Sequence, residues 1–212
     1  MIFFCLVGLT LLSLPESRNL EKLLLHPSAE WNVAFSKQNL FYRHGPLPQT
    51  RQGRDITFTN DIALIKLNRR VRFTDKIQPV KLPHSQFSYM GYQCYVSGWG
   101  IQAPDEGPSP SLKGAELVVV DGSQTQGCST QSGWGKLCAV SLDDFNGKAG
   151  AACPGDSGSP LVTYDSKNGG WTLIGLLSNG AKSCFKGLPE VYTKVGDYLD
   201  WIYDTIRENS VP

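Results

Sequence analysis

One segment of the sequence places a serine between two glycines, an arrangement that can serve chemistry. The run from Cys153 to Pro160 reads CPGDSGSP. Glycine tolerates a positive φ, so a strained turn at Gly155 and Gly158 can present the hydroxyl of Ser157 outward. Taken alone, such a segment is equally typical of an ordinary surface turn.

A second segment puts a carboxylate at the mouth of an apolar strand. Asp61 directly precedes the run Ile62-Ala63-Leu64-Ile65. A buried Asp needs hydrogen-bond donors to offset its desolvation, and a histidine imidazole is one natural partner. A capping Asp at a strand edge is the alternative. A third segment, Ser97-Gly98-Trp99-Gly100, follows shortly after Cys94.

Short strands joined by turns are the elements that would position these groups. The 22 glycines and 13 prolines are spread along the chain, which favours such strands. We predict strands at 56–67, 94–96, 116–120, 161–164, 171–177 and 191–195. The stretch 18–55 is predicted to be irregular, with a loop at 45–54. Helical spacing of apolar residues predicts one terminal helix over 197–208, so the fold class is all-β with a C-terminal helix.

Composition excludes several classes of function. The 212 residues include 20 Lys and Arg and 19 Asp and Glu, which gives a net charge of +1. This balance argues against nucleic-acid binding as the main function. No apolar run reaches the ~20 residues of a membrane span. The longest, residues 2–14, has the length of a signal-peptide core or of a buried strand. The six cysteines lack zinc-site spacing and predict disulfides in an oxidising compartment, and no metal or nucleotide motif occurs, so no cofactor is expected.

Taken in order, the three segments, the cysteines and the terminal helix resemble the trypsin/chymotrypsin-like (S1 family) serine proteases over about residues 56–208. The resemblance implies that Asp61 is the aspartate of the catalytic triad and Ser157 its nucleophile. It assigns the oxyanion hole to the backbone N–H groups of Gly155 and Ser157.

The same resemblance implies the substrate-binding residues. Ser178, Asn179 and Gly180 match the segment that pairs with the substrate backbone, although the family usually has Trp where this chain has Asn179. Ala151 matches the base of the primary specificity pocket, where trypsin-like enzymes carry Asp. Glu190 matches a pocket-wall position that is usually Gly. Its carboxylate would accept Lys or Arg or narrow the pocket for aromatic side chains, unless it turns to solvent.

The cysteines match the family with one exception. The resemblance implies the disulfides Cys128–Cys138 and Cys153–Cys184. Cys94 matches half of a third, but Thr163 occupies the partner position. Cys94 is then a free buried thiol, or it pairs with Cys5 or with another chain.

Two catalytic features of the family are missing from the sequence. The triad histidine belongs to an Ala-Ala-His-Cys segment, whereas none of the three histidines, His26, His44 and His84, is followed by Cys. The basic residue followed by Ile-Val-Gly-Gly, at which the family is activated, is also absent. Without the ammonium freed there, Asp156 is expected to lack a partner and to leave the site zymogen-like.

The implied fold is a trypsin-like double β-barrel that is incomplete at its N-terminal end. Residues 18–60 number about half of what the first barrel normally places before the triad aspartate. We therefore expect a leader at 1–17, a partial N-terminal barrel at 18–85, and a complete C-terminal barrel with the terminal helix at 86–212.

The implied function is peptide-bond hydrolysis through an acyl-enzyme, with activity that is weak or absent because the histidine segment is missing. On this expectation the chain is a truncated form of a secreted endopeptidase. The alternatives are a secreted pseudoprotease that acts as a protein-binding module, or a degenerate fragment that does not fold stably. Expected partners are protein or peptide substrates and protease inhibitors, with no nucleic acid, metal or membrane span.

Overall fold

Strands dominate the regular structure. The computed structural model describes residues 3–6, 10–13, 23–25, 41–44, 51–52, 55–56, 60–66, 73–74, 77–84, 87–103, 107–128, 133–142, 150–166, 169–179 and 188–208. In the N-terminal half the strands are β1 (Phe3–Leu6), β2 (Thr10–Ser13), β3 (Leu23–Leu25), β4 (Phe41–His44), β5 (Arg51–Gln52), β6 (Asp55–Ile56), β7 (Ala63–Lys66) and β8 (Ile77–Pro79). In the C-terminal half they are β9 (Gln93–Gly98), β10 (Lys113–Val120), β11 (Lys136–Ser141), β12 (Pro160–Tyr164), β13 (Trp171–Asn179) and β14 (Glu190–Lys194). A 3-10 turn, η3 (Val195–Tyr198), leads into the helix α1 (Leu199–Glu208).

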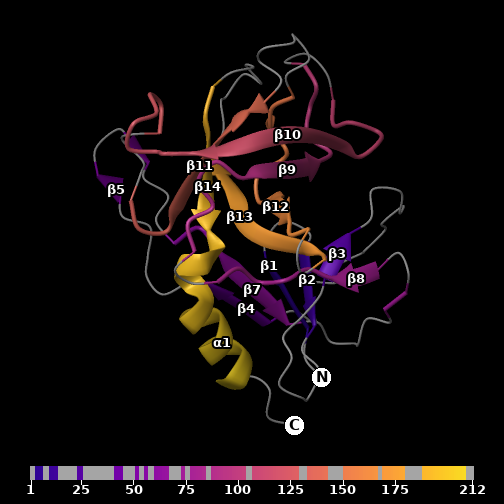
Figure 1. The fold of residues 1–212 in the computed structure, drawn as a ribbon. Helices are drawn as coiled ribbons and strands as arrows, with labels where there is room; N and C mark the ends of the chain where they lie inside the picture. Colours follow the sequence, from indigo (N-terminus) through magenta and orange to yellow (C-terminus); the bar gives the residue numbers. More distant parts are fainter. Residues whose placement is uncertain are drawn as a thin grey trace.

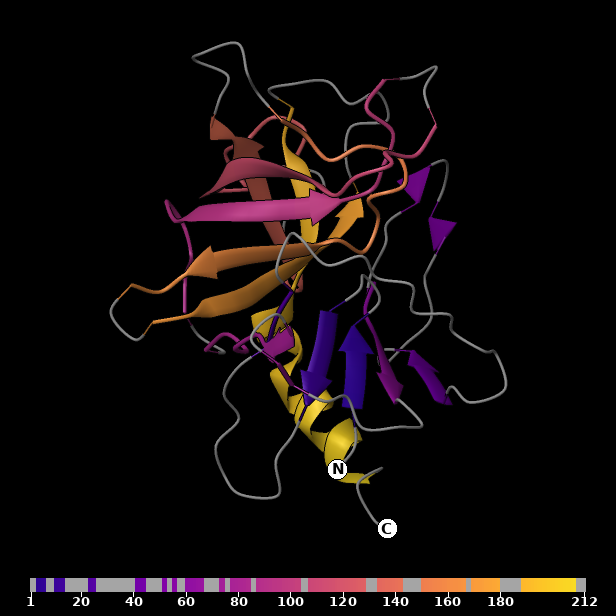
Figure 2. The same ribbon diagram turned by 90° about the vertical axis from the view of Figure 1, so that its right-hand side faces the viewer.

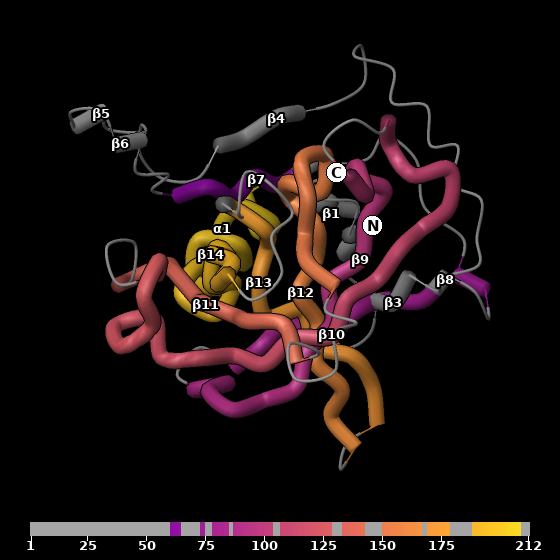
Figure 3. The backbone as a smooth tube through the Cα atoms, turned by 90° about the horizontal axis from the view of Figure 1, so that it is seen from above, coloured from indigo at the N-terminus to yellow at the C-terminus, as the bar shows by residue number. Residues whose placement is uncertain are grey.

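The C-terminal half forms a closed barrel, in the order β10-β11-β14-β13-β12-β9 (Figure 1), and viewed from above its strands form a ring (Figure 3). All the pairings that link neighbouring strands of the barrel are antiparallel. Alternate side chains of these strands point inward and fill the barrel. The interior includes Val96, Leu117, Ala139, Leu161, Ile174 and Tyr192. The predicted all-β class is confirmed, and the closed barrel agrees with the C-terminal barrel that the resemblance implies, while the domain bounds of 86–212 stay a prediction.

The terminal helix packs one apolar face between the two halves of the molecule. Ile202 and Ile206 of α1 are 0% and 5% exposed, and they belong to the same buried cluster as Leu173 of β13 and as Ile62 and Leu64 at β7. Figure 2 shows α1 beside the sheet that contains β7. The predicted helix over 197–208 is confirmed, except that its first two residues belong to the 3-10 turn η3.

The N-terminal half contains more strand than the sequence predicts. Its described strands form an open sheet, β2-β1-β7-β4, and the pairs β3-β8 and β5-β6. The prediction of irregular structure over 18–55 is therefore wrong at β3, β4, β5 and β6. These strands have only two to four residues each, too few for a period of two to show in the sequence.

The first 17 residues, predicted as a leader, include the hairpin of β1 and β2, and β1 also pairs with β7. This agrees with the alternative prediction of a strand for residues 2–14. Processing of this segment as a leader stays a prediction.

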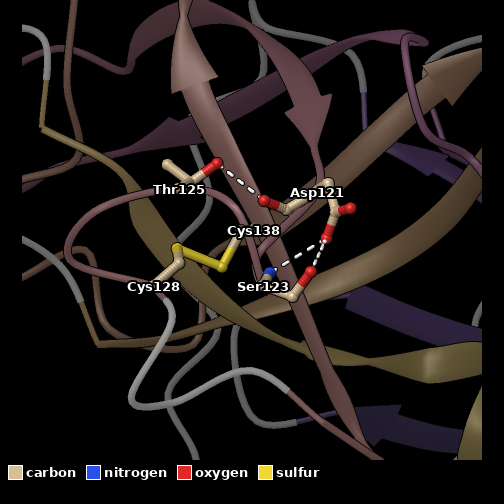
Figure 4. The surroundings of a disulfide bond; sticks show 5 residues. All are labelled: Asp121, Ser123, Thr125, Cys128 and Cys138. Atoms are coloured by element: carbon tan, nitrogen blue, oxygen red, sulfur yellow. Dashed lines mark hydrogen bonds between the residues drawn. A yellow bond between two sulfur atoms is a disulfide. The ribbon is translucent and has the colours of Figure 1, made fainter.

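A disulfide closes the connection between β10 and β11. Cys128 and Cys138 are joined, and both are buried. In Figure 4 the turn before Cys128 is held by Asp121, whose carboxylate accepts hydrogen bonds from the backbone N–H and the hydroxyl of Ser123 at 2.9 and 2.7 Å. Thr125 donates to the carbonyl of Asp121 at 2.7 Å. The side-chain bonds fix the turn at residues 121–125, and the disulfide ties Cys128 to β11.

Cys94 and Cys153 differ in their bonding state. Cys94 is fully buried and free, next to Thr163, whose hydroxyl donates to the carbonyl of Gln93 at 2.8 Å. Of the alternatives for Cys94, the structure contains the free buried thiol. Cys153 is disulfide-bonded, while its predicted partner Cys184 lies outside the described residues.

Candidate active site

Ser157 lies exposed on a turn between β11 and β12 in which both flanking glycines have positive φ. Gly155 has φ 101° and Gly158 has φ 83°. A Cβ on Gly155 would lie 3.1 Å from the Cα of Gly100, so only glycine allows this approach of the two backbones. The turn is fixed by hydrogen bonds from Gly158 N to Leu177 O at 2.8 Å and from Ile101 N to Pro154 O at 3.0 Å. The predicted strained turn that presents Ser157 is thus present.

The amides expected to form the oxyanion hole lie in the same turn. Within the described ranges, no hydrogen bond engages the N–H of Gly155 or of Ser157. Two free donors on one tight turn are what a developing oxyanion requires.

The carboxylate of Asp156 accepts two backbone hydrogen bonds. Its Oδ1 accepts a hydrogen bond from Gly100 N at 2.7 Å, and its Oδ2 accepts one from Cys153 N at 2.9 Å. The expectation that this carboxylate lacks a partner is therefore wrong. Two backbone N–H groups stabilise the anion, and the side chain is only half-buried, so no ammonium is needed to offset a buried charge.

Asp61 is held at the junction of the two halves by residues of the C-terminal barrel. Its Oδ2 accepts a hydrogen bond from Ser178 Oγ at 2.8 Å, and its carbonyl accepts one from Thr193 Oγ1 at 2.8 Å. The preceding Asn60, at φ 53°, accepts a hydrogen bond from the hydroxyl of Tyr198 at 3.1 Å. Three elements, β13, β14 and η3, thus fix a carboxylate that precedes β7.

Ser178 supports Asp61, while the other two residues of the predicted substrate segment are only partly defined. Asn179 is the last residue of β13, where its backbone pairs with Val191. The side chain of Asn179 and all of Gly180 lie outside the described residues.

Ala151 lines a cavity of about 300 Å³ beside the Ser157 turn. The cavity is walled mainly by small residues, including Gly98, Gly100 and Ala152. Asp156 and Lys113 also line it.

Glu190 is buried, with 2% of its surface exposed, so the alternative in which it turns to solvent is wrong. Its Oε1 accepts a hydrogen bond from Ala152 N at 2.6 Å, and its Oε2 accepts one from the hydroxyl of Tyr192. Burial raises the pKa of the Glu190 carboxyl, and these two hydrogen bonds oppose the shift. The nearby charge of Asp156 raises it further.

The structure defines the positions of the three histidines to different extents. His44 closes β4, and its backbone lies opposite Ala63, two residues after Asp61. The side chain of His44 and all of His26 lie outside the described residues. His84 is exposed on the segment between β8 and β9. No described histidine side chain therefore contacts Asp61 or Ser157.

Several residues that support Asp61 were not predicted from the sequence. Thr193 and Tyr198 lie in the predicted terminal elements, but nothing in their spacing indicates contact with Asn60 or Asp61. Lys136 begins β11, a strand that was not predicted, and its Nζ donates a hydrogen bond to Ser178 Oγ at 3.1 Å. The only available signal was Asn60 itself, whose side chain commonly stabilises turns.

The described part of the chain contains neither a cluster of metal ligands nor a helix that could span a membrane. There, no three His, Cys, Asp or Glu side chains gather as potential metal ligands. No described helix is long and apolar enough to cross a membrane.

Comparison with known proteins agrees with this geometry. A sequence model of the trypsin family matches residues 31–202, beginning before the segments that carry the resemblance. The chain is 36% identical over 162 residues to CLIP domain-containing serine protease B4 of Anopheles gambiae, covering 72% of this chain and 42% of that protein. It is 36% identical over 156 residues to transmembrane protease serine 5 of Homo sapiens, with coverages of 70% and 32%. It is 36% identical over 157 residues to the proclotting enzyme of Tachypleus tridentatus, with coverages of 69% and 39%.

The chain thus spans less than half the length of each of these relatives. The family match nevertheless covers most of the chain and includes Asp61, Ser157 and Glu190. On this match and on the barrel that it predicts, the chain belongs to the trypsin family of serine proteases.

Proposed function

We propose that the chain is a serine endopeptidase homologue that keeps the nucleophile and its supports but, in these 212 residues, hydrolyses peptide bonds very slowly or not at all. One observation carries the proposal. Ser157 is exposed in its glycine turn, and no described residue hydrogen-bonds to its hydroxyl. Asp61 accepts a hydrogen bond from Ser178 at Oδ2, and no described histidine side chain contacts its carboxylate.

The residues present support part of the acyl-enzyme mechanism. Ser157 would attack the scissile carbonyl, and the amides of Gly155 and Ser157 would stabilise the oxyanion. No described group is placed to take the proton of Ser157. In a well-studied serine protease, loss of the triad histidine costs about 10⁶ in kcat, or about 8 kcal/mol of barrier. Oxyanion stabilisation alone leaves activity far below that of a protease.

Labelling with a fluorophosphonate probe tests the proposal directly. The 212-residue chain and the Ser157→Ala variant are compared, and hydrolysis of a peptide library is followed in parallel. Ser157→Ala is a matched control because the exposed hydroxyl has no described partner to lose. We expect equal, background labelling of both. Strong labelling that depends on Ser157 would overturn the proposal, and His44→Ala would then test whether His44 supplies the base.

A binding function is the second candidate, favoured by the firm support of the cleft. Asp61, Ser178 and Glu190 are all held by hydrogen bonds, and a cavity lies beside Ala151. A cleft whose residues are held in place, but which does not catalyse hydrolysis, suits a pseudoprotease that binds a peptide or a protease inhibitor. Calorimetric titration with a canonical-loop inhibitor should show binding that Ser157→Ala leaves unchanged. Absence of binding by a cooperatively folded chain would exclude this candidate.

We also propose that the chain is secreted. The Cys128–Cys138 disulfide and the disulfide-bonded state of Cys153 support an oxidising compartment. Detection of the processed chain in culture medium from expressing cells tests this.

A further inference from the structure

The strand that follows Asp61 lies in the interior of its sheet. β7 pairs with β4 on one side and with β1 on the other, in a register that places Cys5 opposite Ile65. Figure 2 shows this sheet, coloured indigo to purple, below the closed barrel. Because each edge of a strand presents unpaired N–H and C=O groups, β7 is satisfied on both sides only while β1 is in place.

The side chains at the start of β7 are buried. Ile62, Ala63 and Leu64 are 5%, 4% and 1% exposed, and Ile62 and Leu64 belong to the cluster that joins α1 to β13. A buried strand that loses a neighbour leaves backbone groups without partners, which is costly. Such an edge is also a ready template for pairing with another extended chain.

The strand that fills this position belongs to the segment predicted as a leader. β1 and β2 form a hairpin within residues 1–17. Among the described strands, only β1 and β4 pair with β7. Removal of residues 1–17 on secretion would therefore take away the whole hairpin and open one edge of β7, directly after Asp61.

We propose that the β7 edge beside Asp61 is a strand-acceptor site. In the 212-residue chain the hairpin of β1 and β2 fills it. After removal of residues 1–17, an extended apolar segment of a partner protein fills it by antiparallel strand addition. The inference goes beyond the proposed function: it uses the proposed secretion of the chain but not any activity of Ser157.

The hairpin defines the chemistry of the occupant. Residues 1–14 include no charged side chain, and β1 runs antiparallel to β7 over residues 4–6. A partner segment therefore needs about the length of β1, an apolar sequence and no proline, because proline cannot donate to the ladder. Its affinity comes mainly from main-chain hydrogen bonds.

Peptide binding to the full chain tests the proposal. The probe is a fluorescent peptide of residues 2–8, with serine in place of the cysteine and two added lysines for solubility. Its anisotropy is followed with the wild type, Cys5→Ser and Cys5→Pro. Proline removes a backbone donor from the middle of β1, whereas serine keeps it. We expect micromolar binding to Cys5→Pro and at least about 100-fold weaker binding to the other two chains, because a tethered hairpin competes at an effective concentration on the order of millimolar.

Hydrogen exchange followed by mass spectrometry locates the bound peptide. The amides of β7 should exchange at least about tenfold faster in Cys5→Pro than in Cys5→Ser, and they should slow again when the peptide binds. The amides of β11, in the closed barrel, are the internal reference and should not respond. Unchanged exchange of β7, or no peptide binding by a folded Cys5→Pro chain, would overturn the proposal.

A peptide of reversed sequence distinguishes a partner site from a seat for the hairpin alone. It should bind Cys5→Pro within about tenfold of the first peptide, because strand addition relies on the backbone. A peptide with proline at its centre should not bind. Binding confined to the chain's own sequence would show that the edge serves only the hairpin and would refute the partner site.

A cleavable chain provides a second route in case Cys5→Pro does not fold. A site for a sequence-specific protease is inserted between Ser17 and Arg18, and the folded chain is cut there. Excess peptide should then replace the fragment 1–17, which mass spectrometry detects on release. A fragment that stays bound without exchange would overturn the proposal. Fluorophosphonate labelling of Ser157 is independent of these measurements, so failure of the proposed function would be recognised separately.

Discussion

Substitution of Gly98 by Ala should dislodge the carboxylate that fixes the Ser157 turn. A Cβ at position 98 would lie 2.0 Å from Asp156 Oδ1 and 2.9 Å from Ser159 Oγ. Gly98 does not have a positive φ, so alanine is compatible with its backbone. The effect therefore comes from the contact with Asp156 and not from backbone strain.

The cost follows from the hydrogen bonds that Asp156 would lose. Its carboxylate accepts N–H groups from Gly100 at 2.7 Å and from Cys153 at 2.9 Å. Hydrogen bonds to charged groups contribute about 1.5–3 kcal/mol each. Because Asp156 is only half-buried, hydrogen bonds to water would replace part of this contribution. We therefore expect the free energy of unfolding to fall by about 3 kcal/mol. For a chain of this size the Tm should fall by about 6–12 °C.

Urea unfolding measures the change, with Gly107→Ala as the matched control. A Cβ at Gly107 meets no atom within 4 Å, and Gly107 has no positive φ. This control should change the free energy of unfolding by no more than about 0.5 kcal/mol.

Two results would refute the reasoning. Equal stability of the Gly98→Ala and Gly107→Ala variants would show that Asp156 does not occupy the space beside Gly98. An undiminished cost of Gly98→Ala in an Asp156→Ala background would place the clash elsewhere, at Ser159.

Three further predictions concern the buried groups of the C-terminal barrel and its helix. Burial raises the pKa of Glu190, so its contribution to stability is complete below the unfolded value of 4.5 and is lost as the pH rises through the folded value. Between those two pH values the stability of Glu190→Gln relative to the wild type should rise with pH, by at most about 1.4 kcal/mol per pH unit in urea titrations, and a difference that does not change with pH would contradict the burial of this carboxyl. Burial raises the pKa of Cys94 to about 12, so iodoacetamide at pH 8 should modify this thiol only in denaturant. Mass spectrometry measures the modification, and modification of the native chain would contradict the burial of Cys94. Ile202→Ala should cost about 3 kcal/mol in calorimetry because the side chain is 0% exposed, whereas exposed Asp204→Ala should be nearly neutral, and similar costs would contradict the packing of α1.

Local patterns in the sequence predicted the elements that are long and regular. The apolar spacing from Tyr198 to Ile206 predicted the terminal helix, because helical periodicity shows clearly over three turns. The Gly-Asp-Ser-Gly segment predicted the turn at Ser157, because only glycine takes its positive φ freely. The all-β class followed from the strand and turn composition.

The strand β11 shows where such patterns fail. Leu137, Cys138 and Ala139 are consecutive and all buried, since one side faces the barrel interior and the other packs around the Cys128–Cys138 disulfide. A strand covered on both faces has no alternation for the sequence to display.

The sequence by itself determined which chemical groups the chain carries: the nucleophile Ser157, the carboxylate Asp61, and three histidines without the expected catalytic segment. Only the tertiary structure decided their partners. Asp61 meets Ser178 across 117 positions, Asp156 meets Gly100 across 56, and Glu190 meets Ala152 across 38. Backbone N–H groups and hydroxyls are chemically alike along the whole chain, so which of them satisfies a given carboxylate depends on where closure of the barrel brings it.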